Sequence, residues 1–415
     1  MMQTQSPSLP GTPPPNLRQY ALVTGNYWAF TLTDGALRML VVLHFHQLGY
    51  EPLQIALLFL FYEIFGVVTN LVGGWLGARI GLNRTMNIGL ALQVVALAVL
   101  AVPTAWLTVP LVMATQALSG IAKDLNKMSA KSSVKLLVAD GAQGTLYRWV
   151  AALTGSKNAL KGVGFFLGGG LLTWLGFRGS VLAMAAALAL VWIASLALLR
   201  RDLGRARAVP KFRQVFSKSR AINVLSAARL FLFGARDVWF VVALPVFLAS
   251  VLDWDHWQVG AFLATWVIGY GIVQASAPRF TGRDPRQLPG RGAAFGWAAA
   301  LAVVPAGIAL LLSGWPPQTV LVAGLALFGV LFAVNSALHS YLIVSYARED
   351  GVSLDVGFYY MANAMGRLVG TVLSGWVYQA AGLVACLWIS ALFVTAAALI
   401  ALALPPPART TGQGA

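Results

Sequence analysis

The sequence predicts an all-α integral membrane protein with 12 transmembrane helices, arranged as two six-helix halves related by pseudo-symmetry. Three observations favour this class. The 415 residues are 58% hydrophobic and only 10% charged, whereas a soluble domain usually carries about 25% charged residues. The mean hydropathy is +0.74. Apolar stretches long enough to span a bilayer recur along the chain, and one basic segment divides them into six and six.

The apolar stretches give the order of the predicted helices, because a spanning helix needs about 20 mostly apolar residues. The first half contains the stretches 20–46, 52–78, 85–103, 107–128, 150–176 and 179–199. The second half contains the stretches 222–250, 257–279, 292–313, 317–345, 354–380 and 382–404. The predicted organisation is a disordered tail (1–19), an N-terminal half (20–199), a basic linker (200–221), a C-terminal half (222–404) and a second tail (405–415).

Lys and Arg residues outside the predicted helices lie almost entirely on one side of the membrane. Twenty fall on the side of the two termini, and only Arg178 falls on the other. Because Lys and Arg are retained in cytoplasmic loops, both termini are predicted to be cytoplasmic. The net charge of +16 is therefore explained by the excess of Lys and Arg on the cytoplasmic side of a membrane protein, and no nucleic-acid partner is expected.

The two halves also resemble each other weakly. The segment 48–58 aligns with 252–262, and the same offset brings Asp34 within one residue of Asp237. A second, looser match brings Lys161 and Arg367 within one position of each other. Duplicated halves that face each other across a midplane site are typical of secondary transporters. A chance match between short apolar strings is the alternative.

Twelve charged residues remain within or at the edge of the predicted helices. The cations are Arg38, Lys123, Lys127, Lys157, Lys161, Arg229, Arg236 and Arg367. The acids are Asp34, Glu63, Asp124 and Asp237. A charge at the centre of a spanning helix costs roughly 2.5–3.5 kcal/mol, so such residues usually line a polar cavity or serve a function. Snorkelling of a long side chain to the interface is the alternative, above all for Lys127 and Arg367.

The spacing of these cations predicts a binding site for an anion with more than one charged group. Three helices each carry a pair on one face: Lys123 with Lys127, Lys157 with Lys161, and Arg229 with Arg236. Arg suits bidentate contact with oxyanions, and Lys acts as a mobile point charge. Lys131 and Lys135 continue the four-residue spacing, and we expect them at the cytoplasmic rim, with Lys123 the favoured substrate contact.

The acids are candidates for proton coupling. Asp34 and Arg38 are four residues apart, which favours a local ion pair. Glu63 has no cationic neighbour in its own helix, so it is the better candidate for a carboxyl group that binds and releases a proton.

The remaining proton-coupling candidates are two acids and a histidine. Asp124 follows Lys123 and Asp237 follows Arg236, and adjacent residues on a helix do not face each other, so both acids are expected to pair across helices. His339 can titrate near neutral pH, or it can be a hydrogen-bonded packing residue.

The segment GGWLGARIGLNR (73–84) resembles the loop signature of the major facilitator superfamily, G-x-x-x-D-R-x-G-x-R-R. Gly74, Arg79, Gly81 and Arg84 match this signature, and Ala78 stands at its acidic position. The resemblance implies the fold of that superfamily. Because Ala78 replaces the acidic residue of the signature, the charge relay that this loop usually provides is in doubt.

Longer strings look like the ArsJ-type organoarsenical efflux permeases of bacterial arsenic-resistance operons. They include TDGALRMLVVLHFHQLGY, SGIAKDLNKMSAKSSVKLL and GTLYRWVAALTGSKNALKGVGFFLGG. The resemblance implies a multi-pass monomer in the bacterial cytoplasmic (inner) membrane. It also implies export of 1-arseno-3-phosphoglycerate, which a glyceraldehyde-3-phosphate dehydrogenase of the same operon forms from arsenate.

Other functions remain open at this stage. Within transport, the alternative is an exchanger or exporter of another organophosphate or carboxylate anion. Export coupled to the proton gradient by antiport is the favoured mechanism, and facilitated export down the gradient of the substrate is the alternative to it. A membrane-embedded transferase would need a site such as Asp253, Asp255 and His256. A sensor without transport is a further alternative. The single cysteine, Cys386, excludes thiolate clusters for a soft metal. The outer loops also lack a dense set of acids, histidines or nucleophiles, so we predict no metal, no cofactor and no enzyme activity.

Overall fold

The computed structural model describes residues 16–50, 58–139, 142–199, 203–206, 219–281 and 289–405. Every regular element in these residues is a helix. The predicted disordered tails lie almost wholly outside the described residues, as does most of the basic linker.

The helices follow the predicted order. The first half contains α1 (Leu17–Gln47), α3 (Leu60–Ile80), α4 (Leu82–Leu100), the short 3-10 helix η1 (Thr104–Trp106), α5 (Val109–Leu137) and α6 (Gln143–Leu198). The second half contains α7 (Arg220–Phe240), α8 (Ala243–Ser250), α9 (His256–Ser276), α10 (Pro278–Thr281), α11 (Arg291–Leu311), α12 (Pro317–Tyr346) and α13 (Val352–Ala401).

Two long helices each cross the membrane twice, because a glycine breaks them. Gly176 in α6 has φ 64° and ψ 179°, and Gly382 in α13 has φ 75° and ψ −176°. Residues with a side chain rarely adopt this backbone conformation. Each half therefore ends in a pair of spans joined by a glycine turn. Counting α7 and α8 as one interrupted span, the described helices give the twelve predicted crossings.

Eight helices of the described chain are long and apolar enough to cross a membrane by length and composition alone. Helices α1 and α5 are not among them, since polar and charged residues interrupt their apolar ones. The charged residues that interrupt α1 and α5 are among the interior charges described below. These two helices therefore contribute much of the candidate site.

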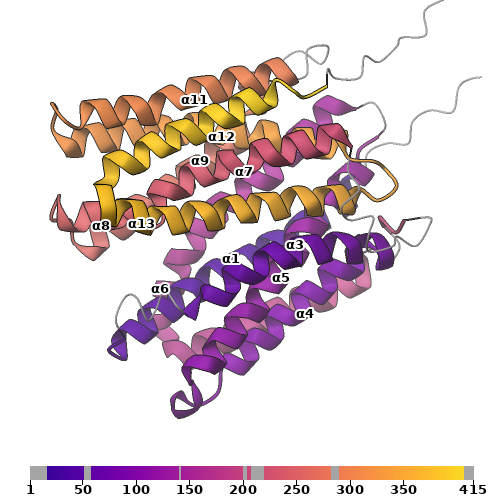
Figure 1. The fold of residues 1–415 in the computed structure, drawn as a ribbon. Coiled ribbons are helices and arrows are strands. Elements are labelled where there is room, and N and C mark those ends of the chain that lie inside the picture. The colour runs from indigo at the N-terminus through magenta and orange to yellow at the C-terminus, as the bar shows by residue number, and fades with distance from the viewer. Residues whose placement is uncertain are drawn as a thin grey trace, which may run out of the picture.

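Figure 1 shows the first half (indigo to magenta) and the second half (red to yellow) as two neighbouring bundles, with both ends of the described chain at the same end of the molecule. We call this the linker end, because residues 203–206 lie there against the α3–α4 junction. The Leu82 amide donates to the Leu203 carbonyl at 2.8 Å, and the Ala206 amide donates to the Ala78 carbonyl at 2.8 Å. The opposite end is the distal end.

Glycines allow the same close packing within each half. A Cβ on Gly168 of α6 would lie 2.4 Å from the Ala36 carbonyl oxygen of α1. In the second half, a Cβ on Gly366 of α13 would lie 2.1 Å from the Leu230 carbonyl oxygen of α7. Small residues at such contacts let membrane helices approach closely. In each half, the first and fifth spans therefore pack closely against each other at a glycine.

The two halves meet closely at the linker end. The Ser353 hydroxyl of α13 donates to the Gly74 carbonyl of α3 at 2.8 Å, and the Tyr341 hydroxyl of α12 donates to Gln143 of α6 at 3.3 Å. A Cβ on Gly155 of α6 would lie 2.3 Å from the Ala275 amide nitrogen of α9. In this conformation the halves are in contact across the linker end.

Candidate functional site

The charges predicted inside the helices converge between the two halves. Tyr62 of α3 lies near the centre of this cluster. Its hydroxyl donates to both carboxylate oxygens of Asp34, at 2.7 and 3.0 Å. The Lys123 ammonium lies 3.7 Å from its ring centroid, and the Arg38 guanidinium carbon lies 4.6 Å from it. Two cations from α5 and α1 are thus held over one aromatic ring.

The local ion pair expected between Asp34 and Arg38 is absent from the described ion pairs. Arg38 instead binds Glu63 of α3, with 3.1 Å between Nη2 and Oε1. Asp34 is occupied by the Tyr62 hydroxyl. Four-residue spacing brings two side chains onto one helix face, but here the neighbouring helix offers each of them a different partner.

Glu63 is part of an ion-pair chain that crosses from one half to the other. Its second oxygen lies 3.7 Å from Arg367 Nη2 of α13. Arg367 Nε in turn lies 3.1 Å from Asp237 of α7, and Asp237 accepts from Arg236 Nε at 2.6 Å. Glu63 has no cationic neighbour on its own helix, as predicted, but it obtains two cations from other helices.

Asp124 and Asp237 depart from the expected pairing. Asp124 pairs with Lys127 one turn further along α5, and not across helices. Asp237 does pair across helices with Arg367, but it also binds its direct neighbour Arg236. The expectation that adjacent residues cannot pair is wrong here, because the long arginine side chain curls back to the carboxylate.

Lys131 does not lie at a solvated rim. It is 4% exposed, and its ammonium donates to the Tyr360 hydroxyl of α13. Lys135 is partly exposed in the last turn of α5, at the linker end, and it donates to the Ser345 carbonyl at 3.2 Å and to the Ala347 carbonyl at the end of α12. Both lysines join α5 to the second half. The prediction is wrong for Lys131, because α5 runs to Leu137, nine residues beyond the predicted end of its apolar stretch at 128, and the second half covers this part of the helix.

The interior is strongly cationic once Lys131 is included, with nine cations for the same four acids. Five of the nine have no carboxylate oxygen within 4.0 Å among the described residues: Lys123, Lys131, Lys157, Lys161 and Arg229. Lys157 and Lys161 share one face of α6, as their spacing predicted. Their polar and aromatic contacts are weak, with Lys157 3.3 Å from Asn158 Oδ1 and Lys161 6.0 Å from the Phe165 ring centroid.

Arg229 differs from the other unpaired cations, because protein groups satisfy it. Its Nε donates to Asn363 Oδ1 at 2.8 Å, and its guanidinium carbon lies 3.8 Å from the Phe233 ring centroid. The side chain is 2% exposed. Arg229 therefore braces α7 against α13, whereas Lys123, Lys157 and Lys161 keep partial exposure and free donors.

His339 on α12 is fully enclosed, at 1% exposure, and its Nδ1 has no hydrogen-bond partner among the described residues. This burial favours the packing interpretation, but the expected hydrogen bond is missing at Nδ1 among the described residues.

The loop residues of the 73–84 segment occupy the linker end. Gly81 adopts φ 99° between α3 and α4, and Gly74 lies where a Cβ would be 2.5 Å from the Ser353 carbonyl oxygen. Ala78, at the acidic position of the signature, is buried and packs against Leu354 at the start of α13. Arg79 stacks over the Trp75 ring at 5.0 Å, and Arg84 lies in the first turn of α4.

Of the residues considered for a transferase site, Asp255 has a structural role. Asp255 caps the start of α9, accepting from the Gln258 amide at 2.7 Å. The side chain of His256 lies outside the described residues. No group of three or more potential metal ligands occurs in the described part of the chain.

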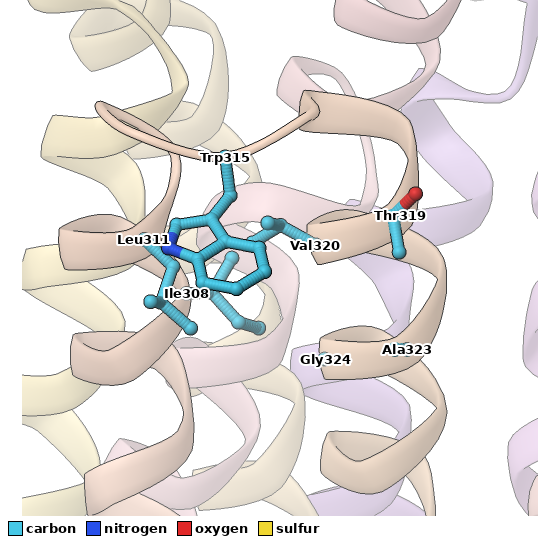
Figure 2. Close-up of a pocket in the computed structure, with 7 residues that line it drawn as sticks. All are labelled: Ile308, Leu311, Trp315, Thr319, Val320, Ala323 and Gly324. Carbon is cyan, nitrogen blue, oxygen red and sulfur yellow. The ribbon is translucent and has the colours of Figure 1, made fainter.

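A cavity of about 250 Å³ lies away from the charges, between the end of α11 and the start of α12. Figure 2 shows Trp315 over this cavity, with Ile308 and Leu311 below it. Thr319 is the one polar residue in the lining, and Trp315 is 65% exposed. An apolar hollow of this kind offers nothing to an anion.

A family model provides the decisive comparison. The model of the Major Facilitator Superfamily matches residues 23–315. The chain belongs to the Major Facilitator Superfamily. Among curated proteins, no sequence matches this chain.

Solved structures of this superfamily share the fold. The human organic anion transporter MFSD10 (TETRAN) superposes with a TM-score of 0.75 at 18% identity, covering 94% of this chain and 100% of its own. A bacterial homologue of the iron transporter ferroportin gives 0.73 at 14% identity, covering 93% and 98%. The proton:xylose symporter XylE gives 0.71 at 13% identity, covering 92% and 95%. Family and fold together establish the class of membrane transporter, not an enzyme.

Proposed function

We propose that this protein is a secondary active efflux transporter that exports 1-arseno-3-phosphoglycerate by alternating access and thereby confers resistance to arsenate. One observation carries the proposal. Between the two halves, nine cations face four acids, and Lys123, Lys157 and Lys161 combine partial exposure with no carboxylate partner among the described residues. A site with this surplus of positive charge attracts an anion with several negative groups.

The chemistry of the unpaired groups suits a phosphate- or arsenate-like oxyanion. Lysine ammonium groups on α5 and α6 supply mobile point charges, and Arg38 and Arg367 supply planar donors. The resemblance to ArsJ-type permeases names one such substrate, which a glyceraldehyde-3-phosphate dehydrogenase would provide. The substrate is already a pentavalent ester, so thiolate ligands are not required.

The bias of Lys and Arg supports placing the linker end in the cytoplasm of a bacterium, at its inner membrane. The halves are in contact at that end, through residues such as Ser353 and Gly74. In the proposed cycle, this conformation follows release of the substrate to the outside. Reopening of the linker end then admits the next substrate from the cytoplasm.

Coupling to protons is proposed to use Glu63. In the absence of substrate its carboxylate binds Arg38 and Arg367. For export driven by the proton gradient, substrate and proton must move in opposite directions. Glu63 is therefore proposed to take up a proton from the outside after the anion leaves and to release it to the cytoplasm before the next anion binds. Asp34, Asp124 and Asp237 are each held by a tyrosine, lysine or arginine and are secondary candidates.

Transport into everted membrane vesicles tests the proposal. Vesicles that contain the protein should accumulate 1-arseno-3-phosphoglycerate, and accumulation should fall to equilibrium when the proton gradient is collapsed. Uptake no greater than in vesicles without the protein would disprove arsenical export. If 3-phosphoglycerate or a dicarboxylate is taken up instead, the alternative of an organophosphate or carboxylate exporter holds. Equal accumulation without the gradient would disprove proton coupling alone.

A further inference from the structure

The interior cations form two layers along the membrane normal. On α5, Lys123 lies one turn above Lys127 and two turns above Lys131, measured toward the distal end. On α6, Lys161 lies one turn above Lys157. With a rise of about 1.5 Å per residue, each four-residue step separates the backbone positions by about 6 Å.

The distal layer surrounds Tyr62. Arg38 and Lys123 lie over its ring, at 4.6 and 3.7 Å from the centroid. Lys161 lies within electrostatic range of Arg38 and Asp34. This layer also contains Glu63, so it holds an internal carboxylate that can substitute for a bound anion.

The deeper layer surrounds Tyr360 of α13. The Lys131 and Lys127 ammonium groups lie 4.5 and 5.0 Å from its ring centroid, and Lys131 also donates to its hydroxyl. Lys157 of α6 lies within electrostatic range of both lysines. Two ammonium groups of α5 therefore lie over one tyrosine ring, and a third, from α6, lies within electrostatic range of both.

This deeper layer is short of negative charge. Its nearest acid is Asp124, which pairs with Lys127, and Asp34, which the Tyr62 hydroxyl occupies, lies within electrostatic range of Lys157. Neither Lys131 nor Lys157 has a carboxylate oxygen within 4.0 Å in the described chain. Lys131 is 4% exposed, and enclosing an ammonium group without a counter-anion is costly. Such a cluster is stabilised when a mobile anion enters it.

We propose that Lys131, Lys157 and Tyr360 form a second subsite, which binds a tetrahedral oxyanion of the phosphate or arsenate type. The distal layer of Arg38, Lys123 and Lys161 binds the other oxyanion of the same substrate. The preferred ligand is then a short chain with an oxyanion at each end, spanning between one helical turn (Lys161 to Lys157) and two (Lys123 to Lys131). This inference deepens the proposed function and rests on it only for the direction of transport.

A purely structural role for Lys131 makes a different prediction. Lys131 and Tyr360 lie on opposite halves, so their hydrogen bond also joins the halves. Loss of such a hydrogen bond between the halves would change the rate of transport. It would not change the ratio between the affinity for a ligand with two oxyanions and the affinity for a ligand with one.

Binding to the purified full-length protein separates these roles. The probes are 1,3-propanediol bisphosphate and propyl monophosphate, measured by isothermal titration calorimetry. The wild-type protein should bind the bisphosphate at least about tenfold more tightly than the monophosphate, or about 1.4 kcal/mol. Lys131→Gln should reduce this ratio to about threefold or less, and Lys131→Arg should restore most of it.

Arg148→Gln is the control, since Arg148 is exposed near the start of α6 and bonds Thr145 on its own helix. It should keep the wild-type ratio of bisphosphate to monophosphate affinity. If Lys131→Gln unfolds in a thermal melt, Lys157→Gln replaces it and should also lower this ratio. A tenfold ratio that survives in the folded variant, or that Arg148→Gln lowers equally, would overturn the subsite.

The outcome is independent of the proposed arsenical. A ratio that falls in Lys131→Gln supports the subsite even if 1-arseno-3-phosphoglycerate is not transported. Conversely, an arsenical transporter whose ratio is unaffected by Lys131→Gln and by Lys157→Gln would retain the proposed function and lose the second subsite.

Discussion

Glu63 of α3 and Arg367 of α13 form an ion pair between the two halves, with 3.7 Å between Oε2 and Nη2. The same carboxylate binds Arg38, and the same guanidinium binds Asp237. An entering anion competes with Glu63 for both arginines. The ion pair therefore connects occupancy of the site to the contact between the halves.

Replacing Glu63 tests this competition. In Glu63→Gln, Arg38 loses its carboxylate and Arg367 keeps only Asp237, so inorganic phosphate should bind about three- to tenfold more tightly, or about 0.7–1.4 kcal/mol. Substrate accumulation driven by a proton gradient should be lost. Calorimetry and vesicle uptake measure the two effects. Glu349→Gln, in the exposed loop before α13, is the control and should change neither. Weaker phosphate binding in Glu63→Gln would contradict the account.

Tyr62 has two separable contributions. Tyr62→Phe removes the hydrogen bond to Asp34 and keeps the ring beneath Arg38 and Lys123. It should weaken phosphate binding less than Tyr62→Ala, which also removes a cation–π contact for each of the two cations, worth about 0.5–2 kcal/mol each. Phosphate titration of both variants measures the order. Equal effects of the two substitutions would show that the ring has no role.

Gly366 fixes the distance between α7 and α13. Gly366→Ala would place a Cβ 2.1 Å from the Leu230 carbonyl oxygen, so the helices must separate. The expected loss is about 1–3 kcal/mol of stability, as for overpacked cores, seen as a lower thermal midpoint in detergent. Gly375→Ala on the same helix is the matched control, since a Cβ added there would meet no described atom within 4 Å. A midpoint lowered equally by both substitutions would exclude the close contact as the cause.

Lys135 stabilises contact between the halves at the linker end. Its ammonium binds carbonyls at the end of α12, and each charge-assisted hydrogen bond is worth about 1.5–3 kcal/mol. Lys135→Gln should shift the population toward an open linker end. Spin labels at the ends of α5 and α12 should then report a longer distance. Arg148→Gln serves as the control, since Arg148 bonds Thr145 on its own helix. An unchanged distance distribution in Lys135→Gln would refute this role.

Periodicity and hydropathy are sufficient to predict the spans and which cations share a face. The observed α4, Leu82–Leu100, lies close to the predicted 85–103, and Lys157 and Lys161 do share one face of α6. Both results depend only on local sequence. The glycine turn at Gly176 joins the two spans whose predicted boundaries are 176 and 179.

Partners from other helices cannot be predicted in this way. Asp34 binds Tyr62 because α3 packs beside α1, and nothing in the four-residue spacing to Arg38 contains that information. Hydropathy alone predicts Lys131 at the cytoplasmic rim, because the polar end of α5 resembles a loop. The second half encloses Lys131, so only the packing of α13 against α5 explains its burial.

The central claim is that the unpaired interior cations bind the exported anion. It is tested most directly by uptake of 1-arseno-3-phosphoglycerate into everted vesicles with Lys123, Lys127, Lys157, Lys161 and Arg236 each replaced by Gln. Lys157→Gln and Lys161→Gln should each lower uptake at least about tenfold, because these lysines have no carboxylate partner in the described chain and their charge is available to the substrate. Undiminished uptake in all five variants would contradict the account.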